Sequence, residues 1–198
     1  MHKQRIILLI ITFALPLWGL GGVLRAQSLK DLFLKMPQEV CPALSEYSRL
    51  ELVDNQKNNK TMQTRNQFRY VSTMKALTDN YAHLVVSNSS EKELKLLTQN
   101  DGSHIILVIS TVHCDSIADS SISFYTTEWT PLDATRYISA PTSAEFRRIS
   151  IDPASDRLTI LITNPLAIQI DDSGIPAETR TSSQTLLWDA TQNQFITH

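Results

Sequence analysis

From about Met62 onward the chain consists of short segments rich in valine, isoleucine, threonine and aromatic residues, each bounded by asparagine, aspartate, serine or proline. Branched and aromatic side chains favour strands, and polar clusters of this kind favour turns. Most connections have hairpin length, which predicts an antiparallel meander. The expected strands cover 66–77, 80–87, 92–98, 103–113, 120–127, 145–151, 157–164, 183–189 and 193–197.

Two of these segments, Ile105–Ile109 and Leu158–Ile162, are nearly continuous apolar runs. A strand that is covered on both faces loses the usual alternation of apolar and polar residues. We therefore expect these two strands to be central and covered on both faces. Long irregular loops are predicted over 131–144 and 171–183.

Two short helices are predicted before the strands. Ser28 and Asp31 resemble a capping box, and apolar residues recur at helical spacing as far as Pro37, which predicts a helix over 28–36. The same period predicts a second helix over 44–57. The expected fold class is α+β, with short N-terminal helices packed on a curved antiparallel β-sheet meander of eight or nine strands.

Residues 1–26 have the features of a secretory signal peptide. Lys3 and Arg5 precede an uncharged apolar run over 6–24, and Pro16 breaks that run before a processing site. A positive start followed by an apolar run is the pattern that directs a chain through the inner membrane. The alternative is an uncleaved anchor, since about 20 apolar residues span a bilayer.

Cleavage is expected after Ala26, with Gly22 as an alternative site, which leaves 27–198 as a single domain. The expected location is periplasmic or secreted, with no stable membrane span once the signal is removed. A net charge of −2 argues against a nucleic-acid partner, because such proteins need a basic face to neutralise phosphates.

Sequence patterns for nucleotide and hydrolase chemistry are missing. After residue 26 the only glycines are Gly102 and Gly174, too few for a phosphate-binding loop or a dinucleotide fingerprint. The chain also has no G-x-S-x-G, C-x-x-C or H-E-x-x-H motif. We therefore predict no catalytic, cofactor-binding or metal-binding residue and no cofactor.

His113 has the most reactive neighbourhood, with Cys114, Asp115 and Asp119 close by in sequence. These residue types suit a thiol–imidazole pair or a metal cluster. Neighbouring residues on a strand point to opposite faces, however, so His113 is not expected to orient Cys114. Cys41 and Cys114 form either a disulfide or two free thiols, since the sequence alone does not bring them together.

Two pairs of acids and a set of aromatic residues are candidate binding groups. Glu91 with Glu93 would share a strand face and Asp171 with Asp172 would lie in a turn, and we interpret both pairs as solvated charge rather than acid–base or calcium sites. Aromatic side chains that line a groove can bind sugar or peptide, although strand aromatics usually pack in a core. The aromatic candidates are Phe124, Tyr125, Trp129 and Trp188.

Several longer motifs resemble a known family. They are "MPQEVCPALSEYSRLELVD" over 36–54, "ELKLL" over 93–97, "HIILVISTV" over 104–112, "DSSISFYTTEWTPL" over 119–132 and "LLWDATQNQFI" over 186–196. Together they resemble an exported domain-of-unknown-function family described mainly from Gram-negative bacteria of the gut and mouth. The resemblance implies a periplasmic or secreted protein of about this length and supplies no catalytic residue.

The expected function is that of an exported, noncatalytic binding or envelope-associated interaction protein. Its partner would be an unknown protein, glycan or small-molecule ligand. One alternative is an envelope hydrolase or isomerase whose site is assembled from residues distant in sequence. Another is a carrier of a small apolar ligand, which would need a cavity lined by apolar side chains.

Overall fold

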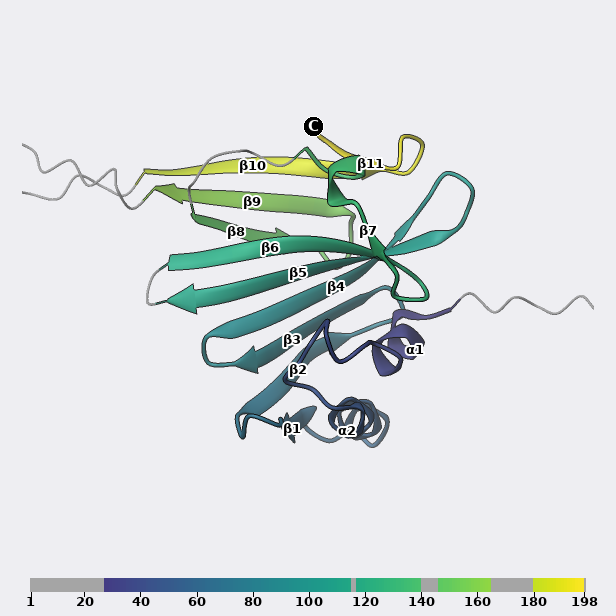
Figure 1. The fold of residues 1–198 in the computed structure, drawn as a ribbon, viewed down its shortest axis with the longest axis vertical. Coiled ribbons are helices and arrows are strands. Elements are labelled where there is room, and N and C mark those ends of the chain that lie inside the picture. Colours follow the sequence, from purple (N-terminus) through teal and green to yellow (C-terminus); the bar gives the residue numbers. More distant parts are fainter. Residues whose placement is uncertain (1–26, 115–116, 140–145, 165–179, 198) are drawn as a thin grey trace, which may run out of the picture.

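The structure is a computed structural model and describes residues 27–114, 117–139, 146–164 and 180–197. Figure 1 shows two short helices and a set of long strands. The helices are α1 (Leu29–Leu34) and α2 (Glu46–Lys57), with a single 3-10 turn, η1 (Ala134–Arg136). The strands are β1 (Gln63–Arg65), β2 (Val71–Leu77), β3 (Tyr81–Ser87), β4 (Ser90–Thr98), β5 (His104–Cys114), β6 (Ile117–Thr126), β7 (Pro131–Leu132), β8 (Phe146–Ile151), β9 (Arg157–Asn164), β10 (Arg180–Asp189) and β11 (Gln194–Thr197).

The described strands form two antiparallel sheets. The first sheet has the order β1-β2-β3-β4-β5-β6-β7, and the second has the order β11-β10-β9-β8. A mainly antiparallel β fold with some helix is therefore confirmed, whereas the expectation of one continuous meander is wrong. Strand signals in a sequence give the length of each strand but not its partner. The long loop predicted over 131–144 lies at the connection between β7 and β8, but a loop alone does not reveal a change of sheet.

Both predicted helices are present within two residues of their expected bounds. Ser28 caps α1, because its hydroxyl accepts a hydrogen bond from the Asp31 backbone N–H at 3.3 Å. Ser45 caps α2 in the same way through the backbone N–H of Ser48. Leu32 and Phe33 of α1 are fully buried in a cluster that also includes sheet residues.

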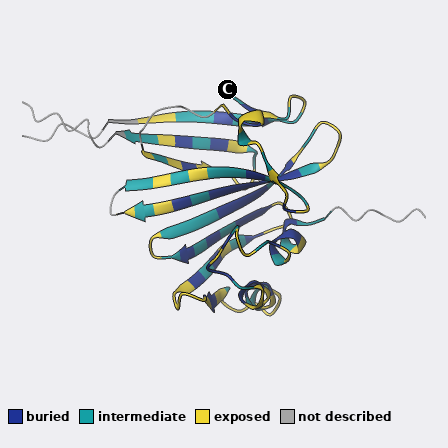
Figure 2. Cartoon of the chain, in the orientation of Figure 1, coloured by how far each residue is buried: buried dark blue, intermediate teal, exposed yellow. Residues whose placement is uncertain are grey.

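Two buried clusters lie on opposite faces of the first sheet. Ile106 belongs to the cluster that includes α1 and α2 residues, and its neighbour Leu107 belongs to the cluster shared with the second sheet. All of Ile105–Ile109 is buried, as predicted for a strand covered on both faces. Figure 2 shows this band of buried residues through the middle of the first sheet.

The same prediction is wrong for β9. Leu158 and Ile160 are buried, but Leu161, which follows Ile160 on the other face of the strand, is 37% exposed. β9 lies between β8 and β10, so it is central in its sheet, yet the second sheet is covered on one face at this position. The apolar run over 158–162 therefore reflects β propensity as well as burial.

The open edge of β8 is closed by side chains of the first sheet. The backbone N–H groups of Arg147, Ile149 and Ile151 donate to Asp119 Oδ1 at 3.4 Å, Ser120 Oγ at 3.0 Å and Glu93 Oε2 at 3.4 Å. An unpaired strand edge is a template for unwanted pairing. These contacts give the backbone N–H groups at the β8 edge hydrogen-bond acceptors, and they attach the second sheet to the first.

Within the described residues, no helix is long and apolar enough to cross a membrane. The predicted signal peptide, residues 1–26, lies outside the described residues, as do Asp171 and Asp172. The cleavage site and the acid pair therefore stay predictions.

Candidate functional site

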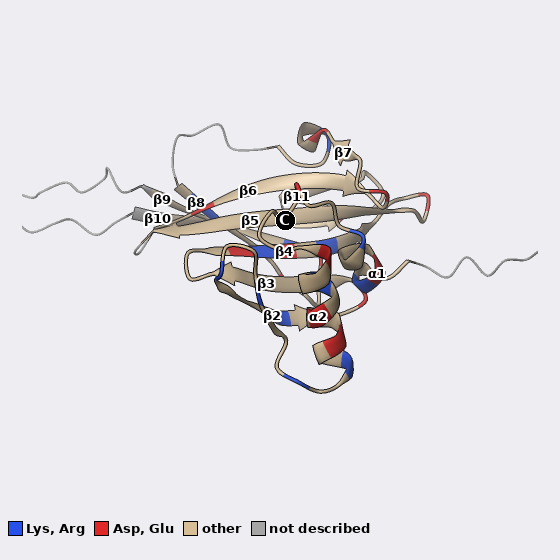
Figure 3. Cartoon of the chain, turned by 60° about the horizontal axis from the view of Figure 1, so that its bottom comes forward, with Lys and Arg blue, Asp and Glu red and all other residues tan. Residues whose placement is uncertain are grey.

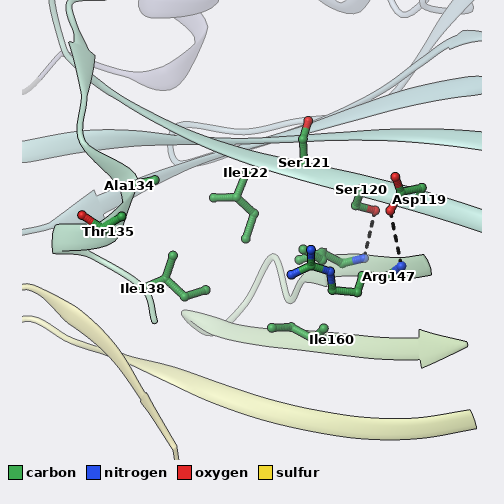
Figure 4. Close-up of a pocket in the computed structure, with 10 residues that line it drawn as sticks. Asp119, Ser120, Ser121, Ile122, Ala134, Thr135, Ile138, Arg147 and Ile160 are labelled. Atoms are coloured by element: carbon green, nitrogen blue, oxygen red, sulfur yellow. Dashed lines mark hydrogen bonds between the residues drawn. The ribbon is translucent and has the colours of Figure 1, made fainter. Parts of the chain in front are cut away.

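A cavity of about 380 Å³ lies between the two sheets, and we call it the inter-sheet cavity. Its walls come from β6, the η1 segment, β8 and β9, so both sheets contribute (Figure 4). The volume falls in the range of small-molecule sites. The lining residues are Asp119, Ser120, Ser121, Ile122, Ala134, Thr135, Ile138, Arg147, Ile149 and Ile160.

Isoleucines form the interior of the inter-sheet cavity. Ile138, Ile149 and Ile160 are buried in the cluster that joins the two sheets, and Ile122 packs against that cluster. In Figure 4 the side chains of Ile122 and Ile138 converge on one space above Ile160. Such a surface offers a favourable environment to an apolar group that leaves water.

The rim of the inter-sheet cavity is polar and carries both signs of charge. Asp119 and Arg147 lie on one side of it, joined by the hydrogen bond from the Arg147 backbone to the Asp119 carboxylate. Ser120 is held from two directions, by Thr111 Oγ1 at 2.8 Å and by the Ile149 N–H. The exposed Thr135 occupies the opposite side. This arrangement suits a molecule with an apolar body and a polar end.

Glu91 is the centre of a second group of polar side chains, on the same face of the first sheet. His83 Nε2 lies 2.9 Å from Glu91 Oε2, and His113 Nε2 lies 3.1 Å from Glu91 Oε1. A carboxylate can only accept hydrogen bonds, so each Nε2 atom carries a proton. Arg148 of β8 adds a guanidinium 3.6 Å from the same carboxylate.

Burial of the Glu91 carboxyl opposes its ionisation, but the hydrogen bonds and charges of His83 and His113 outweigh this effect and lower the pKa of Glu91. A depressed pKa in the folded state contributes stability above the ordinary glutamate pKa of about 4.3, and this stability is lost as the pH falls through the lower folded pKa.

We therefore expect Glu91→Gln to remove part of the acid sensitivity of the protein. Between pH 6 and pH 3, wild type should lose about 1.5 kcal/mol more free energy of unfolding than the variant, the lower end of the range for hydrogen bonds to a charged group. Urea unfolding at a series of pH values measures this difference. Parallel pH profiles for the two proteins would contradict the assignment.

Alternate residues of β4 form a row of charged side chains that faces the second sheet. We call Glu91, Glu93 and Lys95 the polar row. Glu93 accepts hydrogen bonds from Tyr81 OH at 2.8 Å and from the Ile151 N–H. Lys95, 1% exposed, donates to Pro153 O at 3.0 Å and lies 3.3 Å from the Asp156 carboxylate. Figure 3 shows charged residues along β4, whereas β5 is uncharged.

The expectation that Glu91 and Glu93 share a strand face is correct, but their interpretation as solvated charge is wrong. Glu93 is 8% exposed, and the Glu91 side chain is 15% exposed. The physical reason is that the second sheet covers this face of β4, which the sequence around the two acids does not reveal.

The structure does not bring His113 and Cys114 together as a thiol–imidazole pair. The His113 ring is hydrogen-bonded to Glu91, whereas Cys114, the next residue, is exposed. Asp115 lies outside the described residues. Both Cys41 and Cys114 are free, with Cys41 buried. Burial raises the pKa of the Cys41 thiol, which favours an unreactive protonated group. No set of three metal-ligating side chains in the described part of the chain fits a metal ion.

The aromatic candidates form core contacts instead of a groove. Phe124, Trp129 and Trp188 are buried, and Tyr125 packs against the helix-side cluster. Trp129 Nε1 donates to Leu32 O at 3.1 Å, and Trp188 Nε1 donates to Thr98 O at 2.7 Å. These indoles therefore fix elements to one another.

Sequence reasoning did not identify the residues that line the inter-sheet cavity. Ile122, Ile138 and Ile160 lie in three separate segments, and each reads as an ordinary strand or loop residue. Among these lining residues, Asp119 alone carries a chemical signal in the sequence, its place near His113. A site between two sheets can be located only when the sheet that each strand joins is known, and local sequence patterns do not give this.

Comparison with known proteins places the chain beside proteins that have no assigned activity. Residues 22–196 match the family described as "Protein of unknown function (DUF3256)", which confirms the resemblance noted from the motifs. None of the curated proteins compared matches the chain.

A solved structure is also similar, that of a domain of an uncharacterized protein from Porphyromonas gingivalis W83. The TM-score is 0.69 at 22% identity, with 87% of this chain and 98% of that chain covered. At this identity the likeness shows a shared fold alone.

Proposed function

Because this chain belongs to the DUF3256 family, whose function is unknown, we propose a function from its own geometry. The protein is an exported, noncatalytic binding protein that holds a small amphipathic molecule in the inter-sheet cavity. Its location is periplasmic or secreted, a proposal supported by the charged start and apolar run of residues 1–26. This proposal joins two functions expected from the sequence, the noncatalytic binding protein and the carrier of a small apolar ligand.

The observation that carries the proposal is the isoleucine-lined space with a polar rim between the sheets. A well-formed apolar pocket with a few convergent polar groups is the usual form of a small-molecule site. Asp119 and Ser120 could in principle act as a base and a nucleophile, but both accept hydrogen bonds from β8 backbone N–H groups, and the described lining offers no histidine to activate a serine. This use of the polar groups favours binding over catalysis.

The proposal includes a scaffold role for the N-terminal helices, packed on the curved first sheet opposite the cavity. Leu29 and Leu32 share one buried cluster with Leu84 and Ile106, and Trp129 ties α1 to the end of β6. Support on that face would keep β6 in place when a ligand enters on the other face.

The first test uses 1-anilinonaphthalene-8-sulfonate, a fluorescent probe with an apolar body and an anionic end. We expect saturable binding to the folded protein, weakened at least tenfold by Ala134→Phe, which places a ring in the cavity. Thr135→Trp changes an exposed rim residue and should also weaken binding without disturbing the core.

The matched control is Ala154→Phe, in the exposed turn between β8 and β9. It adds the same apolar surface away from the cavity and should bind the probe like wild type. Circular dichroism checks that each variant is folded. Equal probe affinity in wild type, Ala134→Phe and Thr135→Trp would exclude the inter-sheet cavity as the site.

A further inference from the structure

A second hollow of about 390 Å³, which we call the polar hollow, lies where three segments distant in sequence meet. Gln99 comes from the turn between β4 and β5, Arg136 and Tyr137 come from the end of η1, and Gln192–Gln194 come from the turn between β10 and β11. It shares no lining residue with the inter-sheet cavity.

Hydrogen bonds fix these three segments relative to one another. The Asn100 N–H donates to Asn193 Oδ1 at 3.0 Å, which joins the two turns. The Phe195 N–H donates to Tyr137 O at 2.7 Å, which joins β11 to the η1 segment. The polar hollow is therefore formed before a ligand arrives, and a preformed site spares the ligand the cost of ordering it.

The turn between β10 and β11 is itself tightly held. Asp189 Oδ1 accepts hydrogen bonds from the backbone N–H groups of Thr191 at 2.8 Å and Gln192 at 3.2 Å. Asn193 adopts a left-handed backbone conformation with φ of 53°, which asparagine tolerates better than most residues. These contacts hold three consecutive polar side chains at one edge of the hollow.

The chemistry of the polar hollow is unusual for its mixture of amides and lack of acids. Amide side chains offer both donors and acceptors, and Arg136 offers donors alone. Within the described residues, the side chains of Arg136, Gln192 and Gln194 make no hydrogen bond to the protein, so their polar atoms are available to a ligand. A ligand that fits must present many groups that donate and accept together.

We propose that the polar hollow binds a saccharide. Each sugar hydroxyl both donates and accepts a hydrogen bond, which matches the paired donors and acceptors of Gln192 and Gln194. Gln99 adds its side-chain N–H donors, because its Oε1 already accepts a hydrogen bond from Ser103 Oγ at 3.0 Å. A phosphorylated ligand fits less well, because one arginine is the only cation in the lining. Tyr137, which also lines the hollow, is anchored in the core, with its ring centroid 4.8 Å from that of Phe124.

The same chemistry can come from a free sugar or from the end of a glycan chain. Titration of the ¹⁵N-labelled protein, as exported by its host, with glucose, galactose, mannose and N-acetylglucosamine tests the first source. A glycan array probed with the same protein tests the second. We expect at least one of these ligands to shift the side-chain amide resonances of the hollow with millimolar or tighter affinity.

The double variant Arg136→Ala/Gln194→Ala should weaken the best ligand at least tenfold. The double variant Gln63→Ala/Arg65→Ala removes the same residue types from exposed positions on β1 and should bind like wild type. No binding in either format, or equal binding by Arg136→Ala/Gln194→Ala and wild type, would overturn the proposal. Because the hollow and the inter-sheet cavity share no residue, either result leaves the probe experiment above unaffected.

Discussion

Phe124→Ala is expected to lower the free energy of unfolding by about 4 kcal/mol, within the range for removing a buried phenylalanine. Phe124 is 1% exposed and belongs to the cluster between the two sheets. Its ring centroid lies 4.8 Å from that of Tyr137 and 6.5 Å from that of Phe195. The variant therefore loses apolar burial and leaves a cavity where β6 packs against the η1 segment and β11.

Urea unfolding followed by circular dichroism measures the loss. Phe68→Ala is the matched control, because Phe68 is 57% exposed and its removal should change stability by no more than about 0.5 kcal/mol. A loss below about 1.5 kcal/mol for Phe124→Ala would contradict the packing between the two sheets.

Glu93→Ala is expected to cost about 3 kcal/mol, because it leaves two donors without an acceptor at a buried position. The donors are Tyr81 OH and the Ile151 N–H, both bonded to Glu93 Oε2. Glu93→Gln keeps an acceptor at this place and removes only the charge, so it should stay within about 1 kcal/mol of wild type. Equal losses for the two variants would contradict this role of Glu93.

The pKa of Glu93 also distinguishes it from Glu91. Burial raises the pKa of Glu93, although the hydrogen bonds from Tyr81 and Ile151 oppose the effect. A raised carboxyl pKa means that the folded state binds its proton more readily, so this group adds stability as the pH falls through the raised value. Glu91 has the opposite sign, so urea unfolding of Glu91→Gln and Glu93→Gln over a series of pH values separates the two contributions.

The elements of the fold were largely predictable, because each depends on local patterns. The strand expected over 103–113 is β5 at His104–Cys114, and the helix expected over 44–57 is α2 at Glu46–Lys57. β1 and β7 were missed, since strands of three and two residues are too short to show alternation.

The strand predicted over 66–77 begins only at Val71, because residues 66–70 form the turn between β1 and β2. Asn66 Oδ1 accepts hydrogen bonds from the backbone N–H groups of Phe68 and Tyr70, and Arg69 has a positive φ of 69°. An asparagine side chain that bonds its own backbone a few residues on is a turn signal. The aromatic residues around Asn66 concealed this signal within a strand-like segment.

The candidate site was much less predictable than the elements. The inter-sheet cavity depends on how β8 and β9 face β6, and the decisive contacts are long-range bonds from β8 backbone groups to side chains such as Ser120 and Glu93. Sequence patterns report burial and period within a segment but not the sheet that a strand joins. The shared strand face of Glu91 and Glu93 was predicted correctly, but their burial and the part played by Lys95 depend on the second sheet, which local patterns do not reveal.

Native mass spectrometry of the protein purified from its own host tests ligand binding in the inter-sheet cavity most directly. The account predicts a noncovalent small-molecule adduct on wild type and on Ala154→Phe that is lost from folded Ala134→Phe and Thr135→Trp. Identical spectra for all four proteins, with or without an adduct, would contradict it.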